Sequence, residues 1–133
     1  MSVVHSDTIP VASEADVVVV RRRVRELANK VGLSLVDQTK LVTAASELAR
    51  NTVVYGGGGL LQLESLNGPR LGIRLIFEDQ GPGIPDVRLA MRDGFTTGAG
   101  LGLGLGGAKR LVHEFTIESL VGRGTKVAVT RWK

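Results

Sequence analysis

The sequence predicts an α+β fold, a two-layer α/β sandwich in which helices cover one face of a mixed, mostly antiparallel sheet. Strand-like runs at 60–66 and 70–78 flank an Asn-Gly pair, which is a strong signal for a hairpin turn. A second pair of runs, at 115–120 and 125–132, surrounds another glycine-containing turn. Two hairpins favour this sheet over a doubly wound parallel one.

Two helices are expected between a first, edge strand at 3–11 and the first hairpin. Ser13 and Ser34 are N-cap candidates, and Gly32 is a C-cap candidate for the first helix. A third helix is expected over about 105–114, after a long glycine-rich loop. Apolar residues spaced by three and four give each long helix a core face. These residues are Val17, Val20, Val24, Leu27 and Val31 in the first helix, and Leu41, Ala44, Ala45, Leu48 and Val53 in the second.

Length and composition are those of a globular protein, and we predict one domain over residues 1–133. The chain has no cysteine, which excludes a disulfide framework, a thiolate zinc site and thiol catalysis, and suits a reducing cytosol. No run approaches the roughly 20 apolar residues that span a bilayer, and no export signal is visible. We therefore expect a cytoplasmic protein without a membrane partner.

The net charge of +4 raises the question of nucleic acid, but an aromatic content of 4% leaves little to stack on bases. The densest basic run is Arg21, Arg22, Arg23 and Arg25, within the first predicted helix. A solvated helix face is the preferred interpretation. A patch for an acidic protein partner and a nucleic-acid contact are the alternatives, and we expect no nucleic-acid partner.

Glycine is the unusual component, at 18 of 133 residues, about twice the common share. The glycines cluster at 56–59 and at 94–107. Ordered glycine costs backbone entropy, so such clusters indicate loops that need unusual dihedral angles or close ligand approach. A loop as long as 79–107 also favours function over mere connection.

Glu47 and Asn51 are four residues apart on the second predicted helix, so their side chains share one face. A carboxylate and an amide oxygen are hard ligands suited to magnesium and its waters. The carboxylate could also accept a proton from an attacking hydroxyl. The alternative is an ordinary surface pair.

Asp79 directly follows an apolar strand and begins the sequence Asp-Gln-Gly-Pro-Gly. An ionised aspartate only accepts hydrogen bonds, so it could receive an exocyclic amine such as that of adenine. Gly81 and Gly83 would let the backbone approach a flat ring. A tight turn is the alternative.

The glycine run 98–107 leads into the third predicted helix, where free backbone N–H groups could bind phosphate. Gly102, Gly104 and Gly107 match G-x-G-x-x-G, but no βαβ unit surrounds them, and the P-loop pattern is absent. A phosphate site of another architecture is expected. His5 and His113 have no partners at metal-ligand spacing and are interpreted as structural or exposed.

Four motifs together resemble the GHKL superfamily, which has the Bergerat fold. They occur in the order of its N box and three glycine boxes: Glu47-x-x-x-Asn51, Asp79-x-Gly81-x-Gly83, Gly100-x-Gly102-x-Gly104 and Gly122-x-Gly124-Thr125. The stretches SELARN, EDQGPGIPDV and DGFTTGAGLGLGLGGAKRLVHEF are similar to those of RsbT-type switch kinases of bacterial stress signalling. The resemblance covers about residues 13–133.

The resemblance implies a protein serine/threonine kinase that uses ATP and magnesium. Asn51 would ligate magnesium between the ATP phosphates, and Glu47 would be the general base. Asp79 would bind the adenine amine. Supporting roles fall to Gly81 and Gly83 in shaping the pocket, Gly100, Gly102 and Gly104 along the phosphates, and Thr125 at the adenine end.

The implied protein substrate is a STAS-domain partner of the RsbS or RsbR kind in the stressosome, and a PPM-type phosphatase could be activated as well. The alternatives are an RsbW-like kinase that sequesters a sigma factor and a non-catalytic, nucleotide-gated binding module. Some anti-sigma relatives carry an arginine just before the phosphate glycines. This chain has Gly98-Ala99-Gly100 there, so its source of that positive charge is unassigned.

Overall fold

The computed structural model describes residues 2–91 and 104–133. Within them the chain forms helices and strands in nearly the predicted order. The elements are β1 (Ser2–Val11), α1 (Glu14–Val31), α2 (Leu35–Val54), β2 (Gly59–Asn67), β3 (Gly72–Asp79), α3 (Val87–Ala90), α4 (Gly104–Arg110), β4 (Glu114–Leu120) and β5 (Gly124–Trp132).

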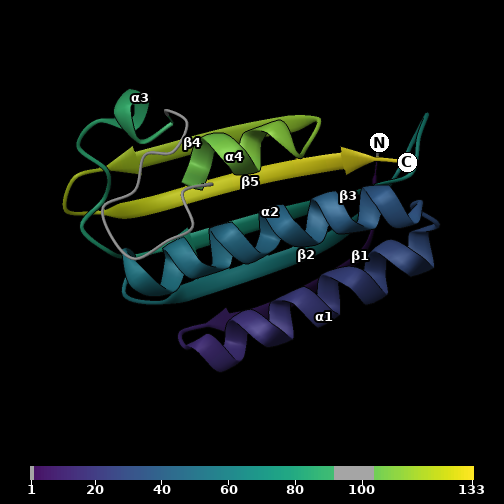
Figure 1. Cartoon of the computed structure of the whole chain (residues 1–133), viewed down its shortest axis with the longest axis horizontal. Coiled ribbons are helices and arrows are strands. Elements are labelled where there is room, and N and C mark those ends of the chain that lie inside the picture. The colour runs from purple at the N-terminus through teal and green to yellow at the C-terminus, as the bar shows by residue number, and fades with distance from the viewer. Residues whose placement is uncertain (1, 92–103) are drawn as a thin grey trace.

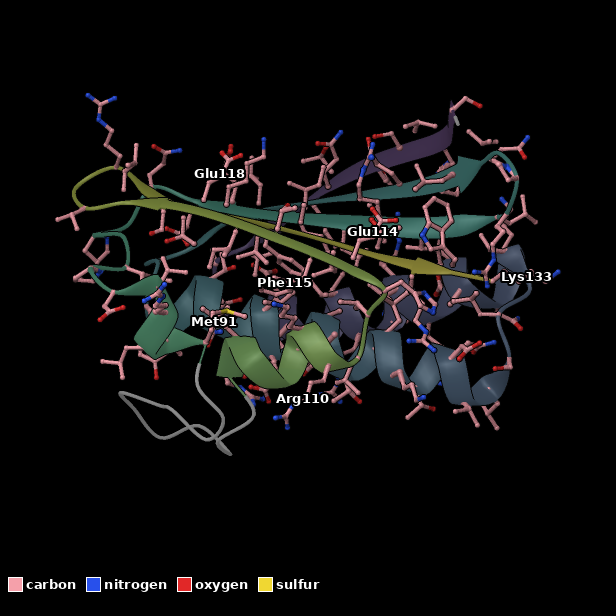
Figure 2. The ribbon with its side chains drawn as sticks, turned by 90° about the horizontal axis from the view of Figure 1, so that it is seen from above. Met91, Arg110, Glu114, Phe115, Glu118 and Lys133 are labelled. Carbon is pink, nitrogen blue, oxygen red and sulfur yellow. The ribbon has the colours of Figure 1, made fainter. Side chains whose placement is uncertain are left out.

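The strands form one five-stranded sheet in the order β1-β2-β3-β5-β4. Every pairing among the described strands is antiparallel, so the mostly antiparallel character is confirmed and the expectation of a mixed sheet is corrected. Helices α1 and α2 lie side by side across one face, and α4 lies over β4 and β5 on the same side (Figure 1). Figure 2 shows the resulting two layers from above. The predicted α+β sandwich is confirmed.

Helix α1 begins and ends at the predicted caps. The Ser13 hydroxyl accepts a hydrogen bond from the Asp16 N–H at 3.3 Å. Gly32 adopts a φ of 94°, a left-handed conformation that suits glycine, and its N–H bonds to the carbonyls of Ala28 and Asn29. The predicted apolar stripe is buried except for Val31, which is half-buried.

Helix α2 is the centre of the helical layer, in contact with α1, α4 and strand β3. Its N-cap follows the prediction, because the Ser34 hydroxyl accepts from the Asp37 N–H at 3.1 Å. Of the predicted core residues, Leu41 and Leu48 are buried, whereas Val53 is half-buried. Alanines 44, 45 and 49 are fully buried.

Two predicted boundaries are wrong. Helix α4 ends at Arg110 instead of 114, because the His113 N–H already bonds to the Thr130 carbonyl and draws the chain into the sheet. The loop predicted over 79–107 contains a short helix, α3, whose first turn is capped by the Asp86 carboxylate accepting from the Leu89 N–H at 3.0 Å. Both differences arise from contacts that periodicity does not report.

Strand β4 alternates between the two sides of the sheet. Phe115 lies between the sheet and the helices, whereas Glu118 points to the opposite, open side (Figure 2). This alternation is typical of an antiparallel sheet with one solvated face.

The basic run of α1 lies on its solvated side, which agrees with the preferred interpretation of a solvated helix face. Arg21 and Arg25 are exposed, Arg22 approaches Glu26 at 3.8 Å, and Arg23 forms an ion pair with Asp7 of strand β1. No helix in the described part of the chain has both the length and the apolar character needed to cross a bilayer.

Candidate active site

A cavity of about 620 Å³ opens between the C-terminal half of α2 and the nearby ends of β3 and β5. Loop 82–86, α3 and the start of α4 complete its wall. This volume is in the usual range for small-molecule sites. The predicted site residues that line the cavity are Glu47, Asn51, Asp79, Gly83, Gly104 and Thr125. Gly81 lies beside Asp79, and the predicted Gly100 and Gly102 lie outside the described residues.

Asp79 ends strand β3 and is only 9% exposed. Its Oδ1 accepts hydrogen bonds from the N–H groups of Gly81, at 2.9 Å, and Thr125, at 3.3 Å. These two bonds fix the orientation of the carboxylate. Its Oδ2 accepts no hydrogen bond from any described residue, so this oxygen is left for a donor that enters the cavity.

Gly56 packs against the side chain of Asp79. The sequence had not assigned Gly56 a role. A Cβ at position 56 would lie 2.4 Å from Asp79 Cγ, closer than real contacts allow. A Cβ on Gly81 would in turn lie 2.7 Å from the backbone of Gly56. Positions 56 and 81 therefore both require glycine, because any larger residue would clash with its neighbour in this packing. The glycine run 56–59 was the available signal, since it directly follows α2.

Thr125 and Gly83 both pack against the end of strand β4. Gly83 has a φ of 79°, and a Cβ there would lie 2.3 Å from the carbonyl oxygen of Leu120. Ser119, which the sequence did not single out, links the two segments. Its hydroxyl accepts from the Ile84 N–H at 2.7 Å and is 2.8 Å from the Thr125 hydroxyl. Ser119 thus positions both loop 82–86 and Thr125.

Glu47 and Asn51 lie on the cavity-facing side of α2, as their spacing predicted. Glu47 is 7% exposed, so the alternative of an ordinary surface pair is wrong. The Asn51 carbonyl accepts from the N–H groups of Tyr55 and Gly56, which closes the helix. The Asn51 side chain is half-buried at the cavity wall.

Arg50 is a lining residue that the sequence analysis missed. Its Nη1 lies 3.8 Å from Glu47 Oε1, and its Nε lies 4.0 Å from Glu14 Oε1 at the start of α1. Both distances exceed those of a hydrogen bond. The only signal in the sequence was its position between Glu47 and Asn51.

The two histidines are not part of the site. His5 is exposed on the edge strand β1. His113 Nδ1 accepts a hydrogen bond from the Trp132 N–H at 2.9 Å, and burial, with Arg131 nearby, lowers the pKa of His113. The structural or exposed interpretation is confirmed. Among the described residues no group of three or more His, Cys, Asp or Glu side chains could hold a metal by itself.

The cavity fits ATP with magnesium in its donors and acceptors. Asp79 Oδ2 offers a buried acceptor to an exocyclic amine, and Gly83 lines the same cavity. At the other part of the wall, the Asn51 amide oxygen is a hard ligand of the kind magnesium prefers, with phosphate oxygens and waters to complete its shell.

Comparison with known proteins identifies the family of this chain. Residues 36–132 match the family model described as histidine kinase-, DNA gyrase B-, and HSP90-like ATPase. The serine/threonine-protein kinase RsbT of Bacillus subtilis (strain 168) is 44% identical over 125 residues, which cover 93% of this chain and 94% of RsbT. An anti-sigma F factor of Thermoanaerobacter sp. (strain X514) is 28% identical over 119 residues, covering 84% of this chain and 82% of that protein.

Solved structures share the fold. The RsbU and RsbW domains of Rv1364c from Mycobacterium tuberculosis superpose with a TM-score of 0.66 at 22% identity, over 96% of this chain and 32% of that longer one. The mycobacterial sensor histidine kinase MprB superposes with a TM-score of 0.56 at 18% identity, covering 96% and 97% of the two chains. The chain therefore belongs to the histidine kinase-, DNA gyrase B- and HSP90-like ATPase family and, within it, to the RsbT-type serine/threonine-protein kinases.

Proposed function

We propose that this protein transfers the γ-phosphoryl group of ATP to a serine or threonine of a STAS-domain partner in a cytoplasmic partner-switching pathway. One observation carries the proposal: Glu47, Asn51 and Asp79, from two different elements, converge on the same cavity. The 44% identity to RsbT over nearly the whole chain supports the same class of reaction.

Each of these side chains has a chemical task suited to its surroundings. Asp79 would accept a hydrogen bond from the adenine amine through Oδ2, since its Oδ1 is already used by backbone donors. Gly81, Gly83 and Thr125 would keep this end of the cavity in shape. When bound, ATP with magnesium supplies the phosphoryl group and part of the charge neutralisation that its transfer requires. Asn51 would hold the metal.

Glu47 would act as general base. Its carboxylate would accept the proton of the partner's hydroxyl, whose oxygen forms the new bond to phosphorus while the bond to the ADP oxygen breaks. Because phosphoryl transfer depends mainly on positioning and charge, few further groups are needed. Gly104, at the start of α4, would contribute to the phosphate wall, together with the predicted Gly100 and Gly102.

The partner proposed is a STAS protein of the RsbS or RsbR kind, with a PPM-type phosphatase as a further binding partner after the switch. A second candidate is a kinase that also sequesters a sigma factor, which the 28% identity to an anti-sigma F factor favours. This second candidate is less favoured, because the identity to RsbT is higher.

The test is a transfer assay with radiolabelled ATP, magnesium and the STAS proteins encoded near this gene, followed by location of the labelled residue. We expect label on a STAS serine or threonine, and none with the Asp79→Asn variant at low ATP. Tight capture of a sigma factor would promote the second candidate. Nucleotide binding without any labelled protein would instead identify a nucleotide-gated binding module and contradict the proposal.

A further inference from the structure

The charges that line the cavity are unbalanced for a triphosphate ligand. In the described part of the wall, four side chains are carboxylates, those of Glu14, Glu47, Asp79 and Asp86, and Arg50 is the one cation. A site of this composition repels a polyanion unless positive charge is concentrated where the phosphates lie. Among the described lining side chains, Arg50 is therefore the one on which such binding depends most.

The contacts of Arg50 leave its guanidinium available. Its two carboxylate neighbours, Glu47 and Glu14, lie at 3.8 and 4.0 Å, so charge attracts them but no hydrogen bond joins them. The side chain is 31% exposed. A guanidinium has five donors in a fixed fork that matches phosphate oxygens, and a phosphate would engage donors that these carboxylates do not.

The position of Arg50 on α2 indicates which phosphate it would meet. It is one residue before Asn51 and within one turn of Glu47, the proposed acceptor of the hydroxyl proton. It lies more than a helical turn before Gly56, which packs on the Asp79 carboxylate. Arg50 thus shares the end of the cavity at which transfer would occur, away from the Asp79 end.

We infer that Arg50 binds the terminal phosphate of ATP and supplies the positive charge for transfer. This inference rests on the proposed function, and it assigns the cation that the uncharged sequence Gly98-Ala99-Gly100 does not provide. Binding would exchange the loose contacts to Glu47 and Glu14 for charge-assisted hydrogen bonds to phosphate oxygens, and would release the Glu47 carboxylate for the incoming hydroxyl.

The test compares ATP with ADP, which differ by the terminal phosphate alone. Each nucleotide, with Mg²⁺, is titrated calorimetrically into wild-type protein and the Arg50→Gln and Arg50→Lys variants, without any partner protein. We expect Arg50→Gln to weaken ATP binding about 10- to 100-fold and ADP binding much less, the size of a lost charged hydrogen bond. Arg50→Lys keeps the positive charge but lacks the forked guanidinium, so its ATP affinity should lie between those of the wild type and Arg50→Gln.

The matched control is Lys40→Gln, which removes one positive charge from the same helix about 15 Å earlier along its axis. Its affinities for both nucleotides should equal those of the wild type, and circular dichroism should show unchanged folding for all variants. An equal loss for ATP and ADP in Arg50→Gln, or no loss, would overturn the inference while leaving the kinase proposal intact. A wild-type protein that binds neither nucleotide would overturn both.

Discussion

The two halves of helix α2 carry charged residues with opposite uses. In the N-terminal half, Asp37 Oδ1 accepts a hydrogen bond from Arg131 Nη2 at 2.6 Å, and the same guanidinium donates to the Leu111 carbonyl at 2.9 Å. In the C-terminal half, Arg50 approaches its carboxylate neighbours no closer than 3.8 Å. The Asp37–Arg131 pair is joined by short hydrogen bonds, although the buried Nε of Arg131 has no partner among the described residues, whereas Arg50 has only longer contacts and is proposed to bind a ligand.

The difference shows how one helix can serve both structure and chemistry. The Asp37–Arg131 pair joins α2 to β5 and to the chain after α4, at the end of α2 opposite the cavity. It holds the helix against the sheet so that the other half can present weakly paired charges to the cavity. Short, directional contacts mark the structural half, and longer ones mark the half proposed to act on ligands.

Glu47→Gln should have the largest effect, because it removes a proton acceptor without changing the size of a buried side chain. Loss of a general base typically slows a reaction about 10²- to 10⁴-fold. We expect that decrease in the rate of transfer to the STAS partner, measured with labelled ATP. The affinity for ADP should remain close to that of the wild type. Transfer at the wild-type rate would show that the weakly paired half of α2 lacks the proposed base.

Gly56→Ala should have the next largest effect, on nucleotide affinity. The added Cβ would meet Asp79 Cγ at 2.4 Å, so the carboxylate must move and its bond to adenine is lost. Overpacking and a lost charged hydrogen bond together predict about 100-fold weaker ATP binding by calorimetry.

Gly57→Ala is the control for that change. Gly57 has a φ of 74° and nothing within 4 Å of an added Cβ. Alanine there should reduce stability by about 1–2 kcal/mol through backbone strain alone and leave nucleotide affinity unchanged. Equal affinities for both variants would mean that Gly56 has no special role at Asp79.

Asp37→Asn should have the smallest effect, confined to stability. The hydrogen bond from Arg131 lowers the pKa of Asp37 below its ordinary value of 3.8. The ionised form therefore stabilises the folded state above that value, and this contribution disappears as the pH falls through the lower, folded-state pKa. We expect Asp37→Asn to reduce stability by about 1 kcal/mol at pH 7 and by much less near pH 3, measured by thermal unfolding.

The matched control for Asp37 is Glu26→Gln on α1, where the partner Arg22 is 3.8 Å away and both side chains are mostly exposed. That change should alter stability by less than about 0.5 kcal/mol at either pH. A pH-independent loss in Asp37→Asn would show that the carboxylate acts through packing and not through its charge.

Local rules were sufficient to predict most of the fold and to place Glu47 and Asn51 on one helix face. The serine caps and Gly32 set the helix ends, and apolar spacing gave the core faces, because these signals act within a few residues along the chain. The spacing of Glu47 and Asn51 likewise placed both on one face. The early end of α4 could not be predicted, because it depends on a hydrogen bond from His113 to Thr130, in the last strand.

The sequence by itself determined the order of elements, the helix caps and the motif residues, since each depends on neighbours along the chain. Only the tertiary structure decided that Gly56 packs on Asp79, that Ser119 links Thr125 to loop 82–86, and that Arg50 is the cation of the described cavity wall. These relations join segments far apart in sequence or depend on which side of a helix faces a cavity. They depend on distances and charges in three dimensions, which no local pattern encodes.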